Sequence, residues 1–333
     1  MAHMKLKKIK KKTKIKTILI ISFIYIIFSY TFYNSLRNNK DISNEKFINF
    51  LLNNGNANFI YEYKFPTIVN KTIVFLLKID FTDPVTLFNQ SILGYTYKDN
   101  TENEEEYSNL EELKEISYYI EDPNKVDIEN PIIYIYNSHQ LENYNNENLE
   151  IYGITPNVLM ASYLLKEKLN QKGLSTIVED TNLTEFLELN NWNYNHSYRA
   201  SRIFILDKQN TYDSLKYYID IHRDSINKAQ STVTINNKLY ARILFVVGLE
   251  HKNYQKNLDI ANKLNNLFNK YYQGLSRGVL KKEGQNVNGI YNQDLSNNSL
   301  LIELGGVDNN IEEVLNTINA IADILEMYIK ESN

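Results

Sequence analysis

The chain has 333 residues, no Cys, five His and a formal net charge of −4. The lack of Cys excludes disulfides and thiolate metal sites, so any metal must be held by His and carboxylate groups. Eight Lys and no acidic residue lie within residues 1–16, so the rest of the chain carries a net charge of −12. A body this acidic argues against nucleic-acid binding, which needs clustered Lys and Arg.

The basic head is followed by an uncharged stretch, residues 17–36. A membrane span needs about 20 such residues, so we predict a transmembrane signal-anchor here. The basic tail, residues 1–16 with a tag remnant at residues 1–3, is then cytoplasmic and the body extracytoplasmic. No Ala occurs between Ala2 and Ala57 to form a small-residue cleavage site, which predicts an uncleaved anchor.

Residues 37–125 are Asn-rich and weakly patterned, which predicts an extracytoplasmic linker or accessory region. Within it, residues 101–115 hold seven Glu against one Lys, as in a solvated linker. Asp122-Pro123 then marks a boundary. We expect a catalytic domain over residues 126–333.

This last region alternates between two kinds of apolar pattern. Expected strands are residues 131–137, 174–178, 217–221, 239–247 and 299–304. Expected helices are residues 156–171, with Gly173 after the end, and residues 253–271 and 311–329. Residues 200–206 favour a helix but leave a strand open. The alternation predicts an α/β fold, with a twisted, largely parallel sheet flanked by helices.

His139 and Glu142 follow the first of these strands, which is too apolar to lie on a surface. Ligands and metals gather at the carboxyl ends of strands in such sheets. The pair is therefore a candidate half-site for a metal. By itself the spacing is weak, since a capping or surface pair has the same pattern.

His222 ends another predicted strand, on the same face as Tyr218 and Asp220. A hydrogen-bonded core histidine is one interpretation. The other is a zinc site made of His139, Glu142 and His222. Two imidazoles and one carboxylate leave a fourth position open for water, which is the catalytic arrangement.

Glu303 lies inside the buried strand at residues 299–304, where Glu is rare unless it is paired or functional. Desolvation would raise its pKa and suit it to move a proton during hydrolysis. A structural ion pair is the alternative. Asn292, in a polar loop before this strand, either offers an amide to a substrate or belongs to a turn.

These residues resemble the stage II sporulation protein P family over about residues 130–330. Its His–Glu–Tyr start matches His139, Glu142 and Tyr144, and its Asp-x-His-Arg-Asp matches residues 220–224. Its Gly-Leu-Ser-x-Gly matches residues 274–278, and its Tyr-Asn-Gln-Asp-Leu matches residues 291–295. Its Leu-Leu-x-Glu-x-Gly-Gly, then Asn and a Glu pair, match residues 300–306, 310 and 312–313.

The chain departs from the family pattern at two places. Asn137 stands where relatives often have a second His, which implies that this position is not needed for metal. The family's Tyr-Pro-Gly is Tyr272-Gln273-Gly274 here, a loop change with little bearing on the site. Related amidases place the second ligand further downstream, so Glu147 or Glu150 stays open as a replacement for Glu142.

The resemblance implies a zinc-dependent N-acetylmuramoyl-L-alanine amidase that cleaves peptidoglycan. Glu303 is then the general base and later the general acid. Arg223 either fixes a substrate carboxylate or pairs with a nearby acid. The implied role is wall thinning during forespore engulfment, beside sporulation protein D, a lytic transglycosylase, and sporulation protein M as membrane-anchored partners.

Two other functions compete with the amidase. A zinc peptidase would shorten the stem peptide instead of releasing it from the glycan. A non-catalytic wall-binding scaffold would need neither zinc nor Glu303, and the presence of both candidate His ligands and Glu303 speaks against it.

Overall fold

A computed structural model describes residues 48–49, 51–52, 119–146, 149, 154–285 and 287–332 of the chain. The predicted basic tail, the predicted anchor at residues 17–36 and most of the predicted linker lie outside these residues. Within the described part, no helix combines the length and the apolar character that a membrane crossing requires.

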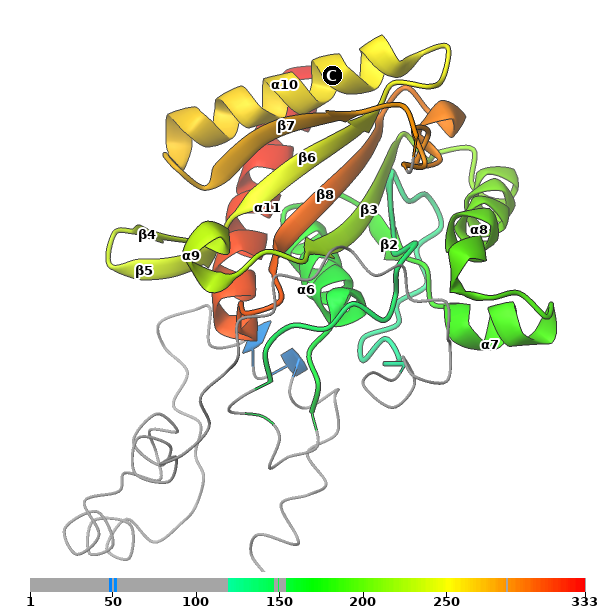
Figure 1. The fold of residues 1–333 in the computed structure, drawn as a ribbon, viewed down its shortest axis with the longest axis horizontal. Helices are drawn as coiled ribbons and strands as arrows, with labels where there is room; N and C mark the ends of the chain where they lie inside the picture. Colours follow the sequence, from blue (N-terminus) through cyan, green and yellow to red (C-terminus); the bar gives the residue numbers. More distant parts are fainter. Residues whose placement is uncertain are drawn as a thin grey trace, which may run out of the picture. The chain divides into compact units, whose positions relative to one another are not determined.

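A six-stranded sheet in the order β2-β1-β3-β8-β6-β7 forms the centre of the fold (Figure 1). Strands β2, β1, β3 and β8 are parallel, β6 and β7 are parallel to each other, and β6 meets β8 antiparallel. The predicted largely parallel sheet is therefore confirmed. Its strands are β1 (Ile133–Tyr136), β2 (Thr176–Val178), β3 (Tyr217–Asp224), β6 (Ile243–Gly248), β7 (Ser276–Lys282) and β8 (Ser299–Gly306).

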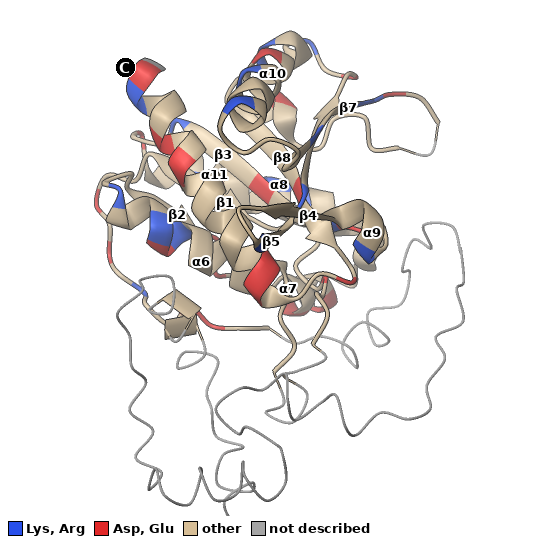
Figure 2. Ribbon diagram, turned by 90° about the vertical axis from the view of Figure 1, so that its left-hand side faces the viewer, with Lys and Arg blue, Asp and Glu red and all other residues tan. Residues whose placement is uncertain are grey.

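Helices pack on the sheet, and the charged side chains lie mainly on the helices and loops. Helix α10 contacts β6 and β7, α11 contacts α6 and β8, and α6 contacts β1, β2 and β3. Most of the sheet carries neither acidic nor basic residues in Figure 2, where charges lie mainly on helices and loops. The helices are α6 (Val158–Gln171), α7 (Leu183–Leu189), α8 (Ser197–Thr211), α9 (Lys228–Ser231), α10 (Tyr254–Tyr271) and α11 (Ile311–Ser332), with the 3₁₀ turns η3 (Tyr194–His196) and η4 (Gln293–Leu295).

The predicted stop signal of α6 acts as expected, and the structure adds a start signal. The Asn157 side chain accepts a hydrogen bond from the Met160 amide and caps the first turn. At the other end, Gly173 takes a φ of +77°, which favours glycine, and its amide donates to the Asn170 carbonyl. Residues 200–206, left open above, lie within helix α8.

The prediction of one strand over residues 239–247 is wrong, because the chain changes sheet within it. Residues up to Ala241 form β5 (Lys238–Ala241), which pairs with β4 (Thr232–Ile235) in a separate antiparallel ladder. Arg242 lies between β5 and β6, and its carbonyl accepts from the Gly305 amide while its own amide donates to Ser231. An apolar run cannot show such a change of partner, because both strands have the same residue preferences.

The segment before the predicted catalytic domain also contacts it. Lys166 of α6 is buried, and its ammonium donates to both carboxylate oxygens of Asp122 at 2.8 and 2.6 Å. The Tyr163 hydroxyl donates to the Ile120 carbonyl at 3.1 Å. Residues 120–122 are thus fixed to the outer face of the fold.

Replacing Phe245 by Ala tests the core between the sheet and α10. The ring is 1 % exposed and lies 6.1 Å from the Phe268 ring of α10. We expect Phe245→Ala to lower the free energy of unfolding by about 3–5 kcal/mol, since a large cavity replaces the ring. Leu189→Ala, at a side chain that is 76 % exposed, is the control and should change it by less than about 0.5 kcal/mol in urea titrations. Equal effects of the two changes would contradict this core assignment.

Candidate metal centre and active site

His139 and Glu142 lie in one tight turn directly after β1. The Glu142 amide donates to the His139 carbonyl at 3.2 Å, which closes the turn. This brings His139 Nδ1 within 3.1 Å of Glu142 Oε1. The predicted half-site therefore forms locally, from residues three apart.

His222 reaches the same place from β3. Strands β1 and β3 pair in parallel, with Tyr136 opposite Asp220, so the turn after β1 lies beside the end of β3. The His222 Nδ1 is 3.5 Å from Glu142 Oε1, and the two imidazole centroids are 4.8 Å apart. One ligand atom from each of His139, Glu142 and His222 lies within 4.8 Å of the others. The structure thus brings the three predicted ligands together.

Glu142 and Asp220 place two negative charges next to the single imidazole of His222. Burial opposes ionisation of Glu142, but the charge of His222 and hydrogen bonds from both imidazoles hold its pKa well below the usual range. Burial also opposes protonation of His222, whereas Asp220 and Glu142 together raise its pKa well above the usual value. Two buried carboxylates compete for one imidazolium, which is the environment that a bound cation would satisfy.

Asp220 supports His222 on the side away from Glu142. Its Oδ2 lies 3.1 Å from His222 Nε2, while its two oxygens accept from the Ser138 amide at 2.9 Å and the Ser138 hydroxyl at 2.7 Å. This contact does not have the geometry of a hydrogen bond, because the buried Nε2 has no such partner among the described residues, so Asp220 acts on the ring through its charge and raises the pKa of His222. Carboxylates in this position orient the histidine ligands of zinc sites.

The polar contacts continue from Ser138 into helix α8. The Ser138 hydroxyl lies 2.8 Å from that of Ser201, and the Asn292 amide group donates to Ser201 Oγ at 3.0 Å and to the Tyr198 carbonyl at 2.9 Å. Asn292 is 6 % exposed and has a φ of +56°. Its amide holds the loop before η4 against α8, and its predicted contact with substrate stays a prediction.

Glu303 lies beside His222 on the next strand. The two are partners in the register of β3 and β8, and Leu244 of β6 lies opposite Glu303 on its other side. Burial raises the pKa of Glu303 to about 8, against the opposing charge of His222. Among the described residues, no group hydrogen-bonds its buried Oε2. A carboxyl beside the ligands with a free oxygen is placed to exchange a proton there.

Arg223 fixes the ligand turn to β3. Its amide donates to Glu142 Oε2 at 2.8 Å, and its Nε donates to the Asn143 carbonyl at 2.8 Å. Both oxygens of Glu142 are therefore oriented, one by imidazoles and one by a backbone amide. The guanidinium also donates to the backbone carbonyl of Asp224 at 3.4 Å, and both roles predicted for Arg223, contact with a substrate carboxylate and pairing with an acid, stay predictions.

Two tyrosines that the sequence analysis missed enclose His139. The Tyr194 ring stacks on it at 5.3 Å, and the Tyr198 ring meets it edge-on at 5.3 Å. Tyr198 also lies parallel to the His222 ring at 6.1 Å. Their spacing of four residues at the start of a helix was the available signal, because it places both rings on one face.

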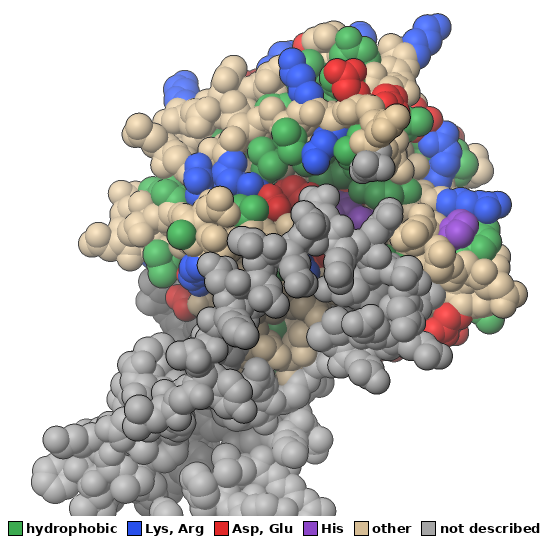
Figure 3. Space-filling view, in the orientation of Figure 1, with side chains coloured by type: hydrophobic (Ala, Val, Ile, Leu, Met, Phe, Trp, Pro, Cys, Tyr) green, Lys and Arg blue, Asp and Glu red, His purple; other side chains and the backbone are tan. Residues whose placement is uncertain are grey.

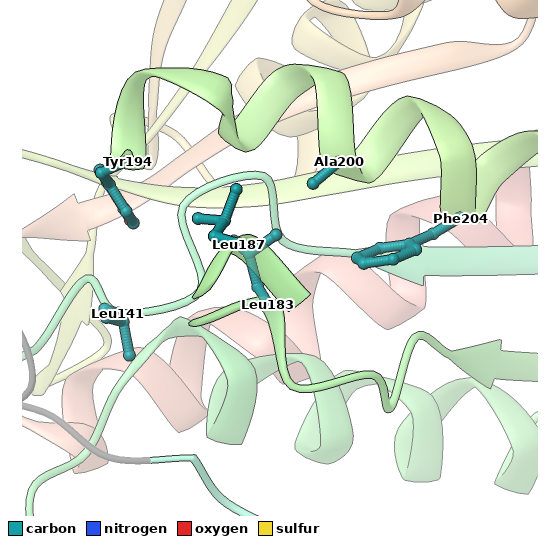
Figure 4. Close-up of a cluster of buried hydrophobic side chains, with 6 residues drawn as sticks. All are labelled: Leu141, Leu183, Leu187, Tyr194, Ala200 and Phe204. Atoms are coloured by element: carbon teal, nitrogen blue, oxygen red, sulfur yellow. The ribbon is translucent and has the colours of Figure 1, made fainter. Parts of the chain in front are cut away.

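An apolar cluster holds one of these tyrosines, Tyr194, beside the site. Figure 4 shows side chains of α7 and α8 and of the turn after β1 directed toward one another. Its members are Leu141, Leu183, Leu187, Tyr194, Ala200 and Phe204. Leu141 stands between the predicted ligands His139 and Glu142, so burial of this cluster also fixes the turn.

The residues present fit zinc. Two imidazoles and one carboxylate form the usual protein ligand set of catalytic zinc, and Asp220 completes the support around His222. Asn137, at the position where relatives often have His, donates to the Ile221 carbonyl at 2.6 Å and accepts from Ser162. Glu147 and Glu150, the alternatives to Glu142, lie outside the described residues.

Comparisons with known proteins agree with the motifs. A family model described as stage II sporulation protein P (SpoIIP) matches residues 81–326. Stage II sporulation protein P of Bacillus subtilis (strain 168) is 39 % identical over 205 residues, which cover 59 % of this chain and 51 % of that protein. The match thus spans about half the length of this relative. No solved structure matches the chain.

Removing either imidazole should abolish the metal site. We expect His139→Ala and His222→Ala to lower bound zinc from about one per chain to a small fraction of that, because two ligands no longer hold the ion. Elemental analysis of the purified protein measures this. His196→Ala is the control, since that ring stacks on Trp192 and bonds to Asn193.

Asp220→Asn should weaken zinc binding without removing a ligand. Loss of such a supporting carboxylate typically costs about 10–100-fold in metal affinity. Competition against a fluorescent zinc chelator measures the affinity. Unchanged affinity would mean that Asp220 serves only to hold Ser138.

Proposed function

The chain belongs to the stage II sporulation protein P family and is a sporulation protein, and we propose that it is a zinc-dependent N-acetylmuramoyl-L-alanine amidase. The single observation that carries this proposal is the convergence of His139, Glu142 and His222 within 4.8 Å, with Glu303 beside them. The resemblance to the family's motifs indicates which bond is cut, the amide between N-acetylmuramic acid and L-alanine. The site residues provide the chemistry that its hydrolysis requires.

The proposed reaction is hydrolysis of the amide between the lactyl group of N-acetylmuramic acid and L-alanine. Zinc held by His139, Glu142 and His222 would polarise the amide carbonyl and make a water molecule more acidic. Glu303 accepts the proton of the attacking water as a carbon–oxygen bond forms. It then returns this proton to the amide nitrogen as the carbon–nitrogen bond breaks, giving a lactyl carboxylate and a free alanine amine.

The surroundings of Glu303 suit this double role. A free carboxylate in water is a weak base, and burial raises the pKa of Glu303 and so its affinity for a proton. A cation bound beside it would lower this pKa again and keep the carboxylate ionised, as a base must be. The rigid pairing of β3 with β8 holds it beside His222 in every turnover. Asp220 and Arg223 keep the imidazole and the Glu142 carboxylate in place and touch no reacting atom.

The proposal includes a location and partners. The uncharged segment at residues 17–36 would anchor the chain, with the basic tail in the cytoplasm and the catalytic domain facing the wall. There the enzyme would thin peptidoglycan during forespore engulfment, together with sporulation proteins D and M. This part of the proposal is supported by the sequence pattern and by family membership.

Digestion of purified sacculi tests the reaction. We expect the protein to release intact stem peptides and leave glycan strands without peptide, as mass analysis of the soluble products would show. A zinc chelator should stop release, and added zinc should restore it. Shortened peptides that stay bound to glycan would identify a peptidase instead, and no product at all would favour a wall-binding scaffold.

Glu303→Gln tests whether Glu303 is needed for turnover but not for zinc binding. The amide is nearly isosteric with the carboxyl and cannot accept the proton, so kcat should fall by about 10²–10⁴-fold while zinc content is kept. Glu312→Gln, at an exposed position in the first turn of α11, is the matched control. Normal release of stem peptides by the Glu303 variant would show that another group is the base.

A further inference from the structure

Arg277 extends from the edge of the sheet toward the metal centre. Its Nη2 lies 2.7 Å from Asp224 Oδ2, and the two side chains are only 15 % and 19 % exposed. Arg277 belongs to β7, whereas Asp224 belongs to β3, so the contact passes over β6 and β8. Residues two apart on a strand share a face, so Asp224 lies on the face of β3 that carries His222.

An irregularity in β7 directs Arg277 onto this face. Ser276 pairs with Ile243 and Val279 with Phe245, so β7 has one more residue than β6 between these pairs. Gly278 takes a φ of +107° there, which an L side chain rarely adopts. Bulges of this kind re-aim a side chain and are common beside active sites.

A second guanidinium lies close by. Arg242 donates to the Gly274 carbonyl at 3.0 Å and the Gln230 carbonyl at 3.3 Å, so both of these acceptors are neutral. Burial and then the charge of Arg277 lower the pKa of Arg242, which places the two cations within electrostatic range. Asp224 pairs with Arg277, whereas the acceptors of Arg242 are backbone carbonyls.

The pair of arginines retains capacity for an anion. Within the described part of the chain, Arg277 Nε is buried and has no acceptor. A buried donor without a partner is costly, and a charged one more so, which favours any ligand that supplies an acceptor. Guanidinium groups match carboxylates in geometry as well as in charge.

The position of the arginines indicates which carboxylate they meet. Asp224 is two residues beyond His222, a spacing of about 7 Å along a strand. In an extended peptide two residues span up to about 7 Å, so a carboxylate on the residue after L-alanine falls within this distance of the amide to be cut. Figure 3 shows basic side chains, acidic side chains and a histidine close together on one side of the molecule.

We propose that Arg277, supported by Arg242, forms a subsite for the carboxylate of the acidic residue that follows L-alanine in the stem peptide. This inference depends on the amidase function proposed above. It names a determinant of substrate choice, because a stem peptide with a carboxamide at that residue would leave the arginines without their acceptor.

Two synthetic muramoyl peptides that differ only at this group test the subsite. One carries a free α-carboxylate on the second residue and the other a carboxamide. We expect the purified, zinc-loaded full chain to cleave the carboxylate form with kcat/KM about tenfold or more higher, in line with a charge-assisted hydrogen bond. Arg277→Gln should bring the ratio of the two kcat/KM values close to one, because the carboxylate form loses more rate than the carboxamide form.

Two further variants guard against a folding defect. Arg277→Lys keeps the charge beside Asp224 but loses the planar fork, so we expect a preference between those of the wild type and the Gln variant. Lys330→Gln removes a charge from the exposed end of α11 and should behave as the wild type. Equal loss of rate on both peptides in Arg277→Gln would assign the residue a purely structural role and overturn the subsite.

A binding measurement separates this inference from the proposed function. Calorimetry with the two free peptides, without glycan, reports affinity whether or not the protein cleaves. Tighter binding of the carboxylate peptide that Arg277→Gln abolishes would support the subsite even if no amide is cut. Cleavage of both muramoyl peptides with no preference, and equal binding of both free peptides, would reject the subsite and leave the amidase intact.

Discussion

Tyr136 and Asp220 lie side by side because β1 and β3 pair in parallel, and the proposed metal centre depends on this pairing. Parallel strands end at the same edge of a sheet, so the turn after β1 meets the end of β3 there. His139 and Glu142 come from that turn, and His222 comes from that strand end. A shift of one residue in this register would turn His222 to the opposite face of the sheet and remove it from the other two ligands.

The carboxylates around His222 are costly to bury, and the contacts that offset this cost indicate what the site binds. Glu142, Asp220 and Glu303 surround the single imidazole of His222, and burying carboxylates is costly unless they are paired or bind a cation. The fold offsets part of this cost through backbone and hydroxyl donors, from Arg223 to Glu142 and from Ser138 to Asp220. A dication would offset most of the rest, which is why a geometry of this kind points to metal chemistry.

The helical segment α7–η3–α8 acts as a support for the site. Its apolar side chains meet Leu141 within the ligand turn, while Tyr194 and Tyr198 contact the imidazoles. Ser201 and Asn292 join the same region through buried hydrogen bonds. The turn after β1 is thus held on one side by apolar packing and on the other by β3, which restricts the positions that His139 can adopt.

The sequence by itself determined the strands and helices with strong patterns, and the types of residue in the site. Parallel strands buried on both faces leave continuous apolar runs, and Gly173 marks the end of α6, so both can be identified without coordinates. Polar residues within such runs, His222 and Glu303, stand out for the same reason. Only the tertiary structure decided the strand order, the change of sheet at Arg242, the contacts of Tyr194 and Tyr198 with His139, and the approach of Arg277 to Asp224. These depend on pairing between distant segments, and a local pattern of hydrophobicity contains no information about which segment a strand will meet.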